Sequence, residues 1–287
     1  MADPKKANLA LYQRKARRQP FGGGDTLDNG GTPRTLRFRV GSMLELVAQI
    51  ARNLAEIRGR MAEAAARSGR RPEEARLVVV TKSVGPAEIR AAVAAGAVDL
   101  AENRPQQLWE RAQALGDLPI CWHLVGHLQR NKVRRTLPWV RYIHAVDSLR
   151  LALAIDEEAA RGPEASPPSA PGPIPILVEV NVSGEPAKHG FAPEEVEPLL
   201  PRLAELRNLR VGGLMCMAGL EGGLETARRQ FAAVRSLRDR LRQNAPPGIA
   251  LGELSMGMSG DFEVAIEEGA TMVRVGSSVF AGLGIGD

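Results

Sequence analysis

The sequence has few cysteines, few tyrosines and no long apolar run. Its two cysteines, Cys121 and Cys216, lie far apart in apolar segments, which favours buried free thiols over a disulfide framework. No apolar run approaches the roughly 20 residues that a membrane-spanning helix needs, and no hydrophobic segment typical of a secretory signal follows the basic N-terminus. We therefore expect a cytoplasmic protein with no membrane partner.

The net charge of +5 is unevenly distributed along the 287 residues. Residues 1–40 hold nine Lys/Arg and three Asp/Glu, which leaves 29 basic and 30 acidic side chains in the rest of the chain. A basic protein would suggest nucleic-acid binding, but the larger part of this chain has no basic excess. We therefore expect no nucleic-acid partner. Nucleic-acid binding through the basic segment stays as a third hypothesis.

The N-terminal residues combine a basic run with glycine-rich stretches and show no hydrophobic period. This composition predicts that residues 1–42 form a disordered basic segment. Three origins stay open: a native arm, a misassigned start codon with Met43 as the true start, or residues added for expression. We expect residues 43–287 to form the folded domain.

From Met43 onward the hydrophobic pattern is regular and predicts an amphipathic helix that ends near Gly69. After this helix, short apolar runs alternate with helical patterns, as is typical of parallel strands buried on both faces. The expected strands are 77–82, 98–103, 122–127, 142–148, 176–183, 211–217, 252–259 and 271–277. The expected helices are 86–95, 104–115, 129–136, 148–161, 193–206, 222–244 and 260–268, with a further short helix from Ser277 as an option.

Eight strand–helix units predict a single (β/α)8 barrel with an extra N-terminal helix. The alternative, a doubly wound open sheet, usually has fewer strands and a glycine-rich first turn. Here the turn after the first strand reads SVGP and contains no such motif.

Polar residues follow the predicted strands at their C-terminal ends, where barrels gather their functional groups. Lys82 ends the first strand after a run of apolar residues. One interpretation is a surface lysine whose aliphatic stem packs along the protein. The other is an amine nucleophile that forms a Schiff base with an aldehyde. The pattern alone leaves both open.

Two runs of small residues, 254–262 and 274–278, follow the seventh and eighth strands. Backbone N–H groups at such turns favour phosphate oxygens, and barrel phosphate sites often lie in these two loops. Ordinary tight turns are the alternative. Arg274 lies within an apolar strand and needs either an ion-pair partner or a polar cavity. Our hypothesis places it in the barrel mouth beside the anion site.

Two of the four histidines, His123 and His127, stand four residues apart in one segment. They would share a face of a strand, but no third ligand follows at a useful spacing. We therefore expect no metal site, and expect both histidines to be hydrogen-bonded near the barrel mouth. An aldehyde-accepting lysine opposite a phosphate site forms a pocket for pyridoxal 5′-phosphate (PLP), which is our cofactor hypothesis.

Eight segments of the chain resemble, in order, the YggS/PROSC family of pyridoxal-phosphate homeostasis proteins. These segments are LVVVTK, AENRPQQ, WHLVGHLQRNK, HAVDS, VEVNVSGEPAKHGF, GLMCMA, LSMGMSGDFEVAIEEGATMVRVGS and VFAG. The resemblance covers about residues 43–284 and implies the barrel of fold-type III PLP proteins, similar to the N-terminal domain of alanine racemase. Ala101 stands where the family usually has glycine, which removes no expected contact.

The resemblance also implies roles for individual residues. Lys82 matches the lysine that forms the internal aldimine with PLP. Arg274 matches the arginine that faces the cofactor ring, and Asn103 falls in a motif near the cofactor. The phosphate-binding positions are matched by Ser259, Gly276 and Ser277.

The alternative function is that of a PLP-dependent amino-acid racemase. Two-base racemisation needs a second acid/base opposite Lys82, and in alanine racemases a tyrosine fills this role. Of the two tyrosines here, Tyr12 lies in the basic segment and Tyr142 starts its strand, at the wrong end of the barrel. We therefore expect a homeostasis protein with no catalytic residues. It would be a monomer or weak dimer, with PLP-dependent apoenzymes as recipients.

Overall fold

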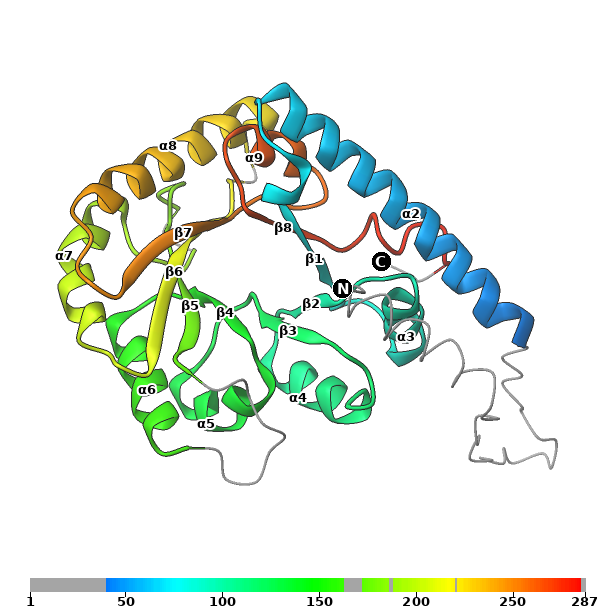
Figure 1. The fold of residues 1–287 in the computed structure, drawn as a ribbon, viewed down its shortest axis with the longest axis horizontal. Helices are drawn as coiled ribbons and strands as arrows, with labels where there is room; N and C mark the ends of the chain where they lie inside the picture. The colour runs from blue at the N-terminus through cyan, green and yellow to red at the C-terminus, as the bar shows by residue number, and fades with distance from the viewer. Residues whose placement is uncertain (1–39, 163–171, 186–187, 220, 285–287) are drawn as a thin grey trace, which may run out of the picture.

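The computed structural model describes residues 40–162, 172–185, 188–219 and 221–284. In these residues eight parallel strands pair in chain order, and β8 pairs with β1 to close a barrel (Figure 1). Each strand overlaps a predicted apolar run, so the expected (β/α)8 barrel is confirmed. The strands are β1 Arg76–Val80, β2 Asp99–Glu102, β3 Cys121–Leu124, β4 Tyr142–Val146, β5 Ile174–Glu179, β6 Leu209–Met215, β7 Ile249–Ser255 and β8 Met272–Val275.

Helices follow the strands and surround the barrel (Figure 1). They are α2 Val40–Arg67, α3 Pro86–Ala94, α4 Pro105–Ala114, α5 Val133–Thr136, α6 Leu149–Ala160, α7 Pro193–Ala204, α8 Gly223–Gln243 and α9 Phe262–Glu267. Three 3-10 segments are η1 Pro72–Glu74, η2 Arg130–Lys132 and η3 Leu137–Trp139. The helix expected at 129–136 is therefore divided, and Pro138 prevents α5 from continuing because it lacks a backbone N–H. Residues 277–284, the last that the structure describes, form turns and no helix.

The extra N-terminal helix α2 packs on the outside of the barrel against α3 and α9 (Figure 1). It begins at Val40, so it includes three residues of the segment that we expected to be disordered; residues 1–39 lie outside the described residues. Its buried face includes Leu54 and Ile57, each worth about 1.5–3 kcal/mol on burial. Arg60 of α2 pairs with Glu263 of α9 at 2.6 Å.

The apolar core has two parts. The larger part lies between the strands and the helices, and the smaller part fills the barrel interior. The interior part consists of Val78, Ala101, Val125, Ala145, Leu177, Met215 and Met272, with Val80 and Tyr142 packed against it. Because side chains alternate along a strand, these residues show which positions at the strand ends face the mouth.

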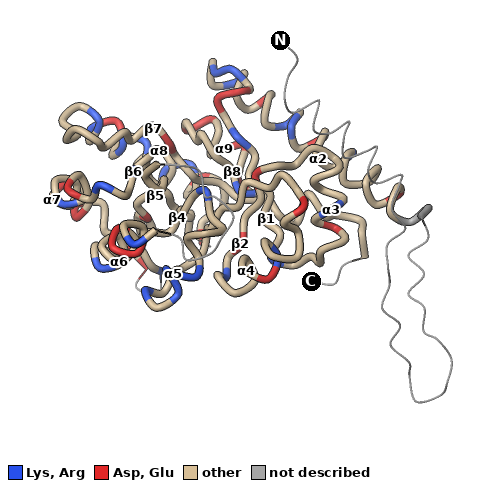
Figure 2. The backbone as a smooth tube through the Cα atoms, turned by 60° about the horizontal axis from the view of Figure 1, so that its bottom comes forward, with Lys and Arg blue, Asp and Glu red and all other residues tan. Residues whose placement is uncertain are grey.

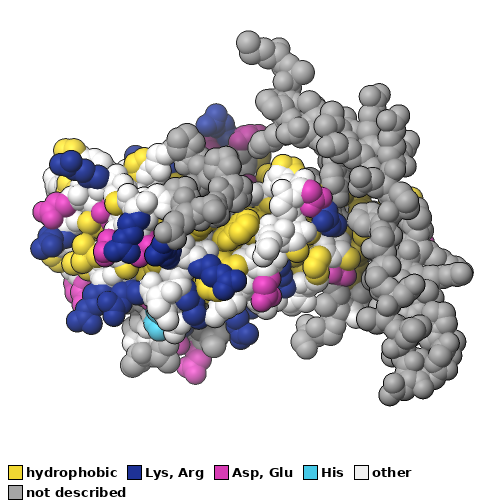
Figure 3. Space-filling model, turned by 90° about the horizontal axis from the view of Figure 1, so that it is seen from below, with side chains coloured by type: hydrophobic (Ala, Val, Ile, Leu, Met, Phe, Trp, Pro, Cys, Tyr) yellow, Lys and Arg dark blue, Asp and Glu magenta, His cyan; other side chains and the backbone are white. Residues whose placement is uncertain are grey.

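Charged residues lie mainly on the helices and loops around the barrel (Figure 2). On the face shown in Figure 3, basic and acidic side chains are interspersed. None of the described helices is both long enough and apolar enough to cross a membrane.

Candidate functional site

The predicted cofactor residues meet where β2, β1 and β8 lie side by side. Val80 pairs with Ala101 in β2, and Val79 pairs with Val275 in β8. Extending these registers by one or two residues places Lys82 between Asn103 on one side and the start of the β8 loop on the other. Barrel closure therefore brings together residues that are almost 200 positions apart in the chain.

Lys82 lies on the same strand face as Val78 and Val80, which fill the barrel interior. Its side chain is exposed, and it has no hydrogen bond or ion pair with the described residues. The amine is thus accessible to a ligand at the mouth. Partial burial would favour a nucleophilic amine, whereas the Lys82 side chain is exposed.

The loop that carries Lys82 is held from outside the barrel by Arg111 of α4. The Arg111 guanidinium donates to the carbonyls of Thr81, at 2.8 Å, and Val84, at 2.6 Å, and forms an ion pair with Glu102. Glu102 is fully buried, and burial raises the pKa of its carboxyl despite the bonds from Thr81 and Arg111. Glu102 follows Ala101 on the face away from the mouth, so it positions the loop and does not face a ligand.

The two small-residue loops after β7 and β8 contact each other. The backbone N–H of Gly276 donates to Ser259 Oγ at 3.3 Å, which joins two of the predicted phosphate positions. A Cβ added at Gly276 would lie 3.0 Å from the carbonyl oxygen of Val80, so a larger residue would require the loop or β1 to shift by a few tenths of an ångström. Ser277, the third predicted position, is exposed at the start of the following turn. Asp261 accepts from the Met258 N–H at 2.5 Å.

Arg274 is buried in β8 with an exposed fraction of 5%. Its Nη1 donates to Ser255 Oγ at 2.7 Å, and its Nη2 donates to the carbonyl oxygen of Cys216 at 2.9 Å. Burial lowers the pKa of its guanidinium. Among the described residues Arg274 forms no ion pair, so the alternative of a structural ion pair is not realised there. The charges of Asp261 and Glu179 raise the pKa of the guanidinium against the effect of burial, and an anionic or electron-rich ligand at the mouth would stabilise the buried cation further.

A chain of hydrogen bonds leads from Arg274 down the barrel interior. Ser255 Oγ lies 2.8 Å from His144 Nδ1, and His144 Nε2 lies 2.9 Å from His123 Nδ1. Burial lowers the pKa of both histidines. His123 thus lies deep in the barrel, whereas His127 lies at the rim, 2.7 Å from Asp147. The expected position at the mouth is wrong for His123. This residue lies within β3, and its side chain points into the barrel interior, where it contacts His144.

Sequence reasoning missed Glu179, at the end of β5. It lies two residues after Leu177, which faces the interior, and its exposed fraction is 5%. Burial and, after it, the neighbouring Asp147 raise the pKa of its carboxyl to about 7, against the opposing charge of Arg274. The available signal was a glutamate within the apolar run ILVEV.

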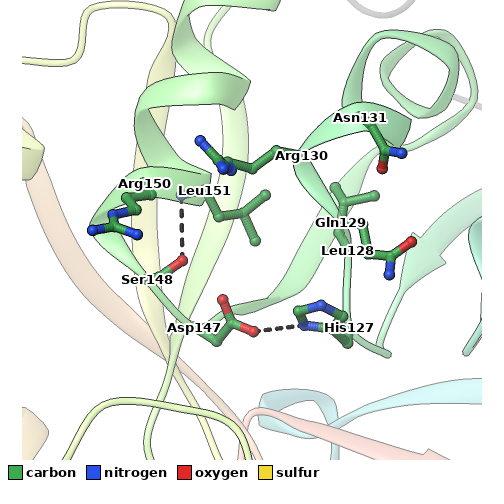
Figure 4. Close-up of a pocket in the computed structure, with 9 residues that line it drawn as sticks. All are labelled: His127, Leu128, Gln129, Arg130, Asn131, Asp147, Ser148, Arg150 and Leu151. Carbon is green, nitrogen blue, oxygen red and sulfur yellow. Dashed lines mark hydrogen bonds and ion pairs between the residues drawn. The ribbon is translucent and has the colours of Figure 1, made fainter.

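A separate cavity of 590 Å³ lies beside the mouth between β3 and α6 (Figure 4). Its lining includes His127, Arg130, Asp147 and Arg150. In Figure 4 the His127 ring points toward the Asp147 carboxylate, and Ser148 caps α6 through the Leu151 N–H at 3.3 Å. None of the six predicted cofactor residues lines this cavity.

Together these features define a class: a parallel (β/α)8 barrel whose mouth offers an exposed amine, two contacting loops of small residues and a buried guanidinium. The donor set fits PLP, because the groups match an aldehyde, a phosphate and an electron-rich ring. The close approach of Gly276 to Val80 and the buried charge of Arg274, which forms no ion pair among the described residues, support that fit.

Residues 48–283 match the family model described as alanine racemase, N-terminal domain, and the chain belongs to this family. Two relatives named pyridoxal phosphate homeostasis protein are similar over most of their length. The one from Pseudomonas aeruginosa is 38% identical over 82% of this chain and 96% of its own. The one from Escherichia coli is 34% identical over 80% of this chain and 95% of its own. The chain is thus a member of the pyridoxal phosphate homeostasis protein family.

Solved structures show the same architecture. The PipY protein of Synechococcus elongatus with PLP bound is 34% identical, with a TM-score of 0.69 over 81% of this chain and all of that chain. An alanine racemase of Clostridium difficile is 16% identical, with a TM-score of 0.61. This chain covers 56% of that racemase, and the likeness shows the shared barrel fold.

Proposed function

We propose that this protein binds PLP at the mouth of its barrel and serves in PLP homeostasis. The observation that carries the proposal is the position of Lys82, whose amine has no partner among the described residues. Lys82 comes two residues after Val80, which lies against Gly276, and is on the same barrel mouth as the buried Arg274. The names of the relatives from P. aeruginosa and E. coli and the PLP-bound state of PipY support it.

In this proposal each predicted residue has one role. The Lys82 amine forms a covalent link to the aldehyde of PLP, with loss of one water. Asn103, next to Lys82 in register, lies near the cofactor, and Arg274 faces its ring. The phosphate is bound by the loops after β7 and β8, through Ser259, Gly276 and Ser277.

We infer a binding protein and not a racemase. Tyr142 lies at the N-terminal end of β4, with its ring stacked on His123 at 5.0 Å, and cannot reach the mouth. Tyr12 lies outside the described residues. Glu179 is the buried carboxyl that we identify at the mouth. A racemisation assay tests directly whether it acts as the second acid/base that the racemase alternative needs.

The proposal includes a cytoplasmic location, since free thiols at Cys121 and Cys216 suit a reducing compartment. It also includes a monomer or weak dimer that delivers PLP to apoenzymes without a nucleic-acid partner. Size-exclusion chromatography and transfer of PLP to an apoenzyme, followed by recovered activity, test these two points.

The central experiment is an absorption spectrum of the protein with PLP, recorded before and after borohydride reduction. Peptide mapping should locate the reduced adduct on Lys82, and Lys82→Ala should abolish it. Lys132→Ala is the matched control, because Lys132 lies in η2 and is not one of the six predicted cofactor residues, so the variant should leave the adduct unchanged.

Two outcomes would contradict the proposal. An adduct that persists in Lys82→Ala would reject the covalent role of Lys82. Racemisation of alanine or serine by the wild-type protein, lost in Lys82→Ala, would replace the binding role with the racemase alternative.

A further inference from the structure

A second cluster of functional groups lies at the opposite end of the barrel from the mouth. Asp99 is the first residue of β2 and Cys121 the first residue of β3, and the two pair in register. His123 follows two residues after Cys121 and therefore lies on the same face of β3. The cluster lies at the other end of the barrel from the proposed cofactor residues, five of which follow the C-terminal ends of their strands while Arg274 lies within β8.

The three side chains converge on one point. His123 Nε2 lies 3.2 Å from Asp99 Oδ1 and 3.6 Å from Cys121 Sγ, and the three ligand atoms all lie within 4.8 Å of one another. Zinc–ligand bonds at tetrahedral angles separate nitrogen from oxygen by roughly 3.4 Å and nitrogen from sulfur by roughly 3.6 Å. The observed spacings are therefore close to those of a tetrahedral site before any side chain moves.

The orientation of His123 is fixed by its surroundings. Its Nδ1 lies 2.9 Å from His144 Nε2, and its ring stacks on Tyr142 at 5.0 Å with an interplanar angle of 8°. A histidine whose one nitrogen is held by a hydrogen bond presents the other nitrogen to a metal. In His123 this other nitrogen is Nε2, which faces Asp99 and Cys121.

Charge and access also suit a cation. Asp99 is 19% exposed and Cys121 is partly exposed, which opens the cluster to solvent at the N-terminal end of the barrel. Burial and the charge of Asp99 raise the pKa of the Cys121 thiol to about 12, so without a cation the thiol keeps its proton. A bound divalent ion would favour the thiolate. Arg76 and Arg141 are the nearby positive charges that oppose binding.

We propose that Asp99, Cys121 and His123 form a binding site for a thiophilic divalent cation of the zinc class. The carboxylate of Asp99 and the thiolate of Cys121 would balance the two positive charges of the cation. The fourth coordination position would be filled from solvent. The spacing of His123 and His127 in the sequence predicted no metal site. The site proposed here uses Asp99 of the neighbouring strand β2, which only the register of β2 with β3 brings close to Cys121 and His123.

A second candidate group, His127, Asp147 and His189, is less suited to a metal. The two imidazole rings stack at 4.4 Å with an interplanar angle of 14°, so their in-plane lone pairs run nearly parallel and do not converge. His189 is 61% exposed and forms a long contact of 3.9 Å with Asp147. This group serves as the internal control for the experiment.

The test is a titration of the full-length, reduced protein with Co²⁺, which reports a bound thiolate through its charge-transfer absorption. We expect one equivalent of Co²⁺ to produce this band and Zn²⁺ to abolish it. Cys121→Ser should remove the band, and Asp99→Asn should weaken Co²⁺ affinity at least about tenfold. His127→Ala should leave the band and the affinity unchanged.

Three results would overturn the proposal: no band at millimolar Co²⁺, a band that persists in Cys121→Ser, or a band lost in His127→Ala. Circular dichroism establishes that each variant is folded, and Cys121→Ala replaces Cys121→Ser if the serine variant is not. The readout needs no PLP, so its failure would leave the cofactor proposal intact.

Discussion

The buried carboxyl of Glu179 makes the stability of this protein depend on pH in a predictable direction. The pKa is 4.5 for an ordinary glutamate and about 7 for Glu179, raised first by burial and then by Asp147. Between these two values the unfolded chain binds fewer protons than the folded protein, so stability falls as the pH rises from about 4.5 to about 7. Above about pH 7 the loss is complete and stays constant.

The size of this loss follows from the two pKa values. A difference of this size corresponds to about 3 kcal/mol at pH 8, about 1 kcal/mol at pH 5 and almost nothing at pH 4. Glu179→Gln removes the ionisation while it keeps the shape of the side chain. We therefore expect the variant to gain about 2 kcal/mol of unfolding free energy over the wild-type protein between pH 5 and pH 8.

Urea unfolding of both proteins without PLP, at pH 5, 6, 7 and 8, measures this difference. Glu56→Gln in α2 is the matched control, because Glu56 is exposed and should give the same small difference at every pH. The reasoning would be refuted if the difference in unfolding free energy between Glu179→Gln and the wild-type protein did not change with pH. Asp147→Asn should reduce the pH dependence of the wild-type protein, since it removes the second cause of the shift.

Two further predictions concern packing and the buried hydrogen bonds. A Cβ at Gly213 would lie 1.8 Å from the carbonyl oxygen of Glu253, so Gly213→Ala should destabilise the protein by at least about 2 kcal/mol. The control is Gly252→Ala, which should cost less than about 1 kcal/mol because the space around its Cβ is open. Ser255→Ala should cost about 2–4 kcal/mol because it leaves Arg274 Nη1 and His144 Nδ1 without their shared partner; a cost no larger than that of Ser68→Ala, whose hydroxyl is partly exposed, would contradict this. Urea unfolding at pH 7 measures all four variants.

The proposed cation and cofactor sites lie at opposite ends of one hydrogen-bonded network. Arg274, Ser255, His144 and His123 form its links, and Asp99 ends it. Arg274, Ser255, His144 and His123 each have a hydrogen-bond partner within this network. These bonds explain how a largely apolar barrel interior tolerates two histidines and an arginine.

The sequence by itself determined the order of the elements and the ends where functional groups gather. Strands and helices leave a local signature, because burial on both faces needs a continuous apolar run and burial on one face needs a helical period. Lys82, Gly276 and Ser277 could thus be placed at the C-terminal ends of their predicted strands, and Tyr142 at the start of its strand, without any knowledge of three-dimensional contacts.

Only the tertiary structure decided which of these residues meet. Closure of β8 onto β1 places Gly276 against Val80, and the register of β2 with β3 sets Asp99 beside Cys121. The environment of Glu179 and the direction of His123 also depend on neighbours from other strands. Such partners are distant in the chain, so no local pattern encodes them, and register and barrel closure assign them.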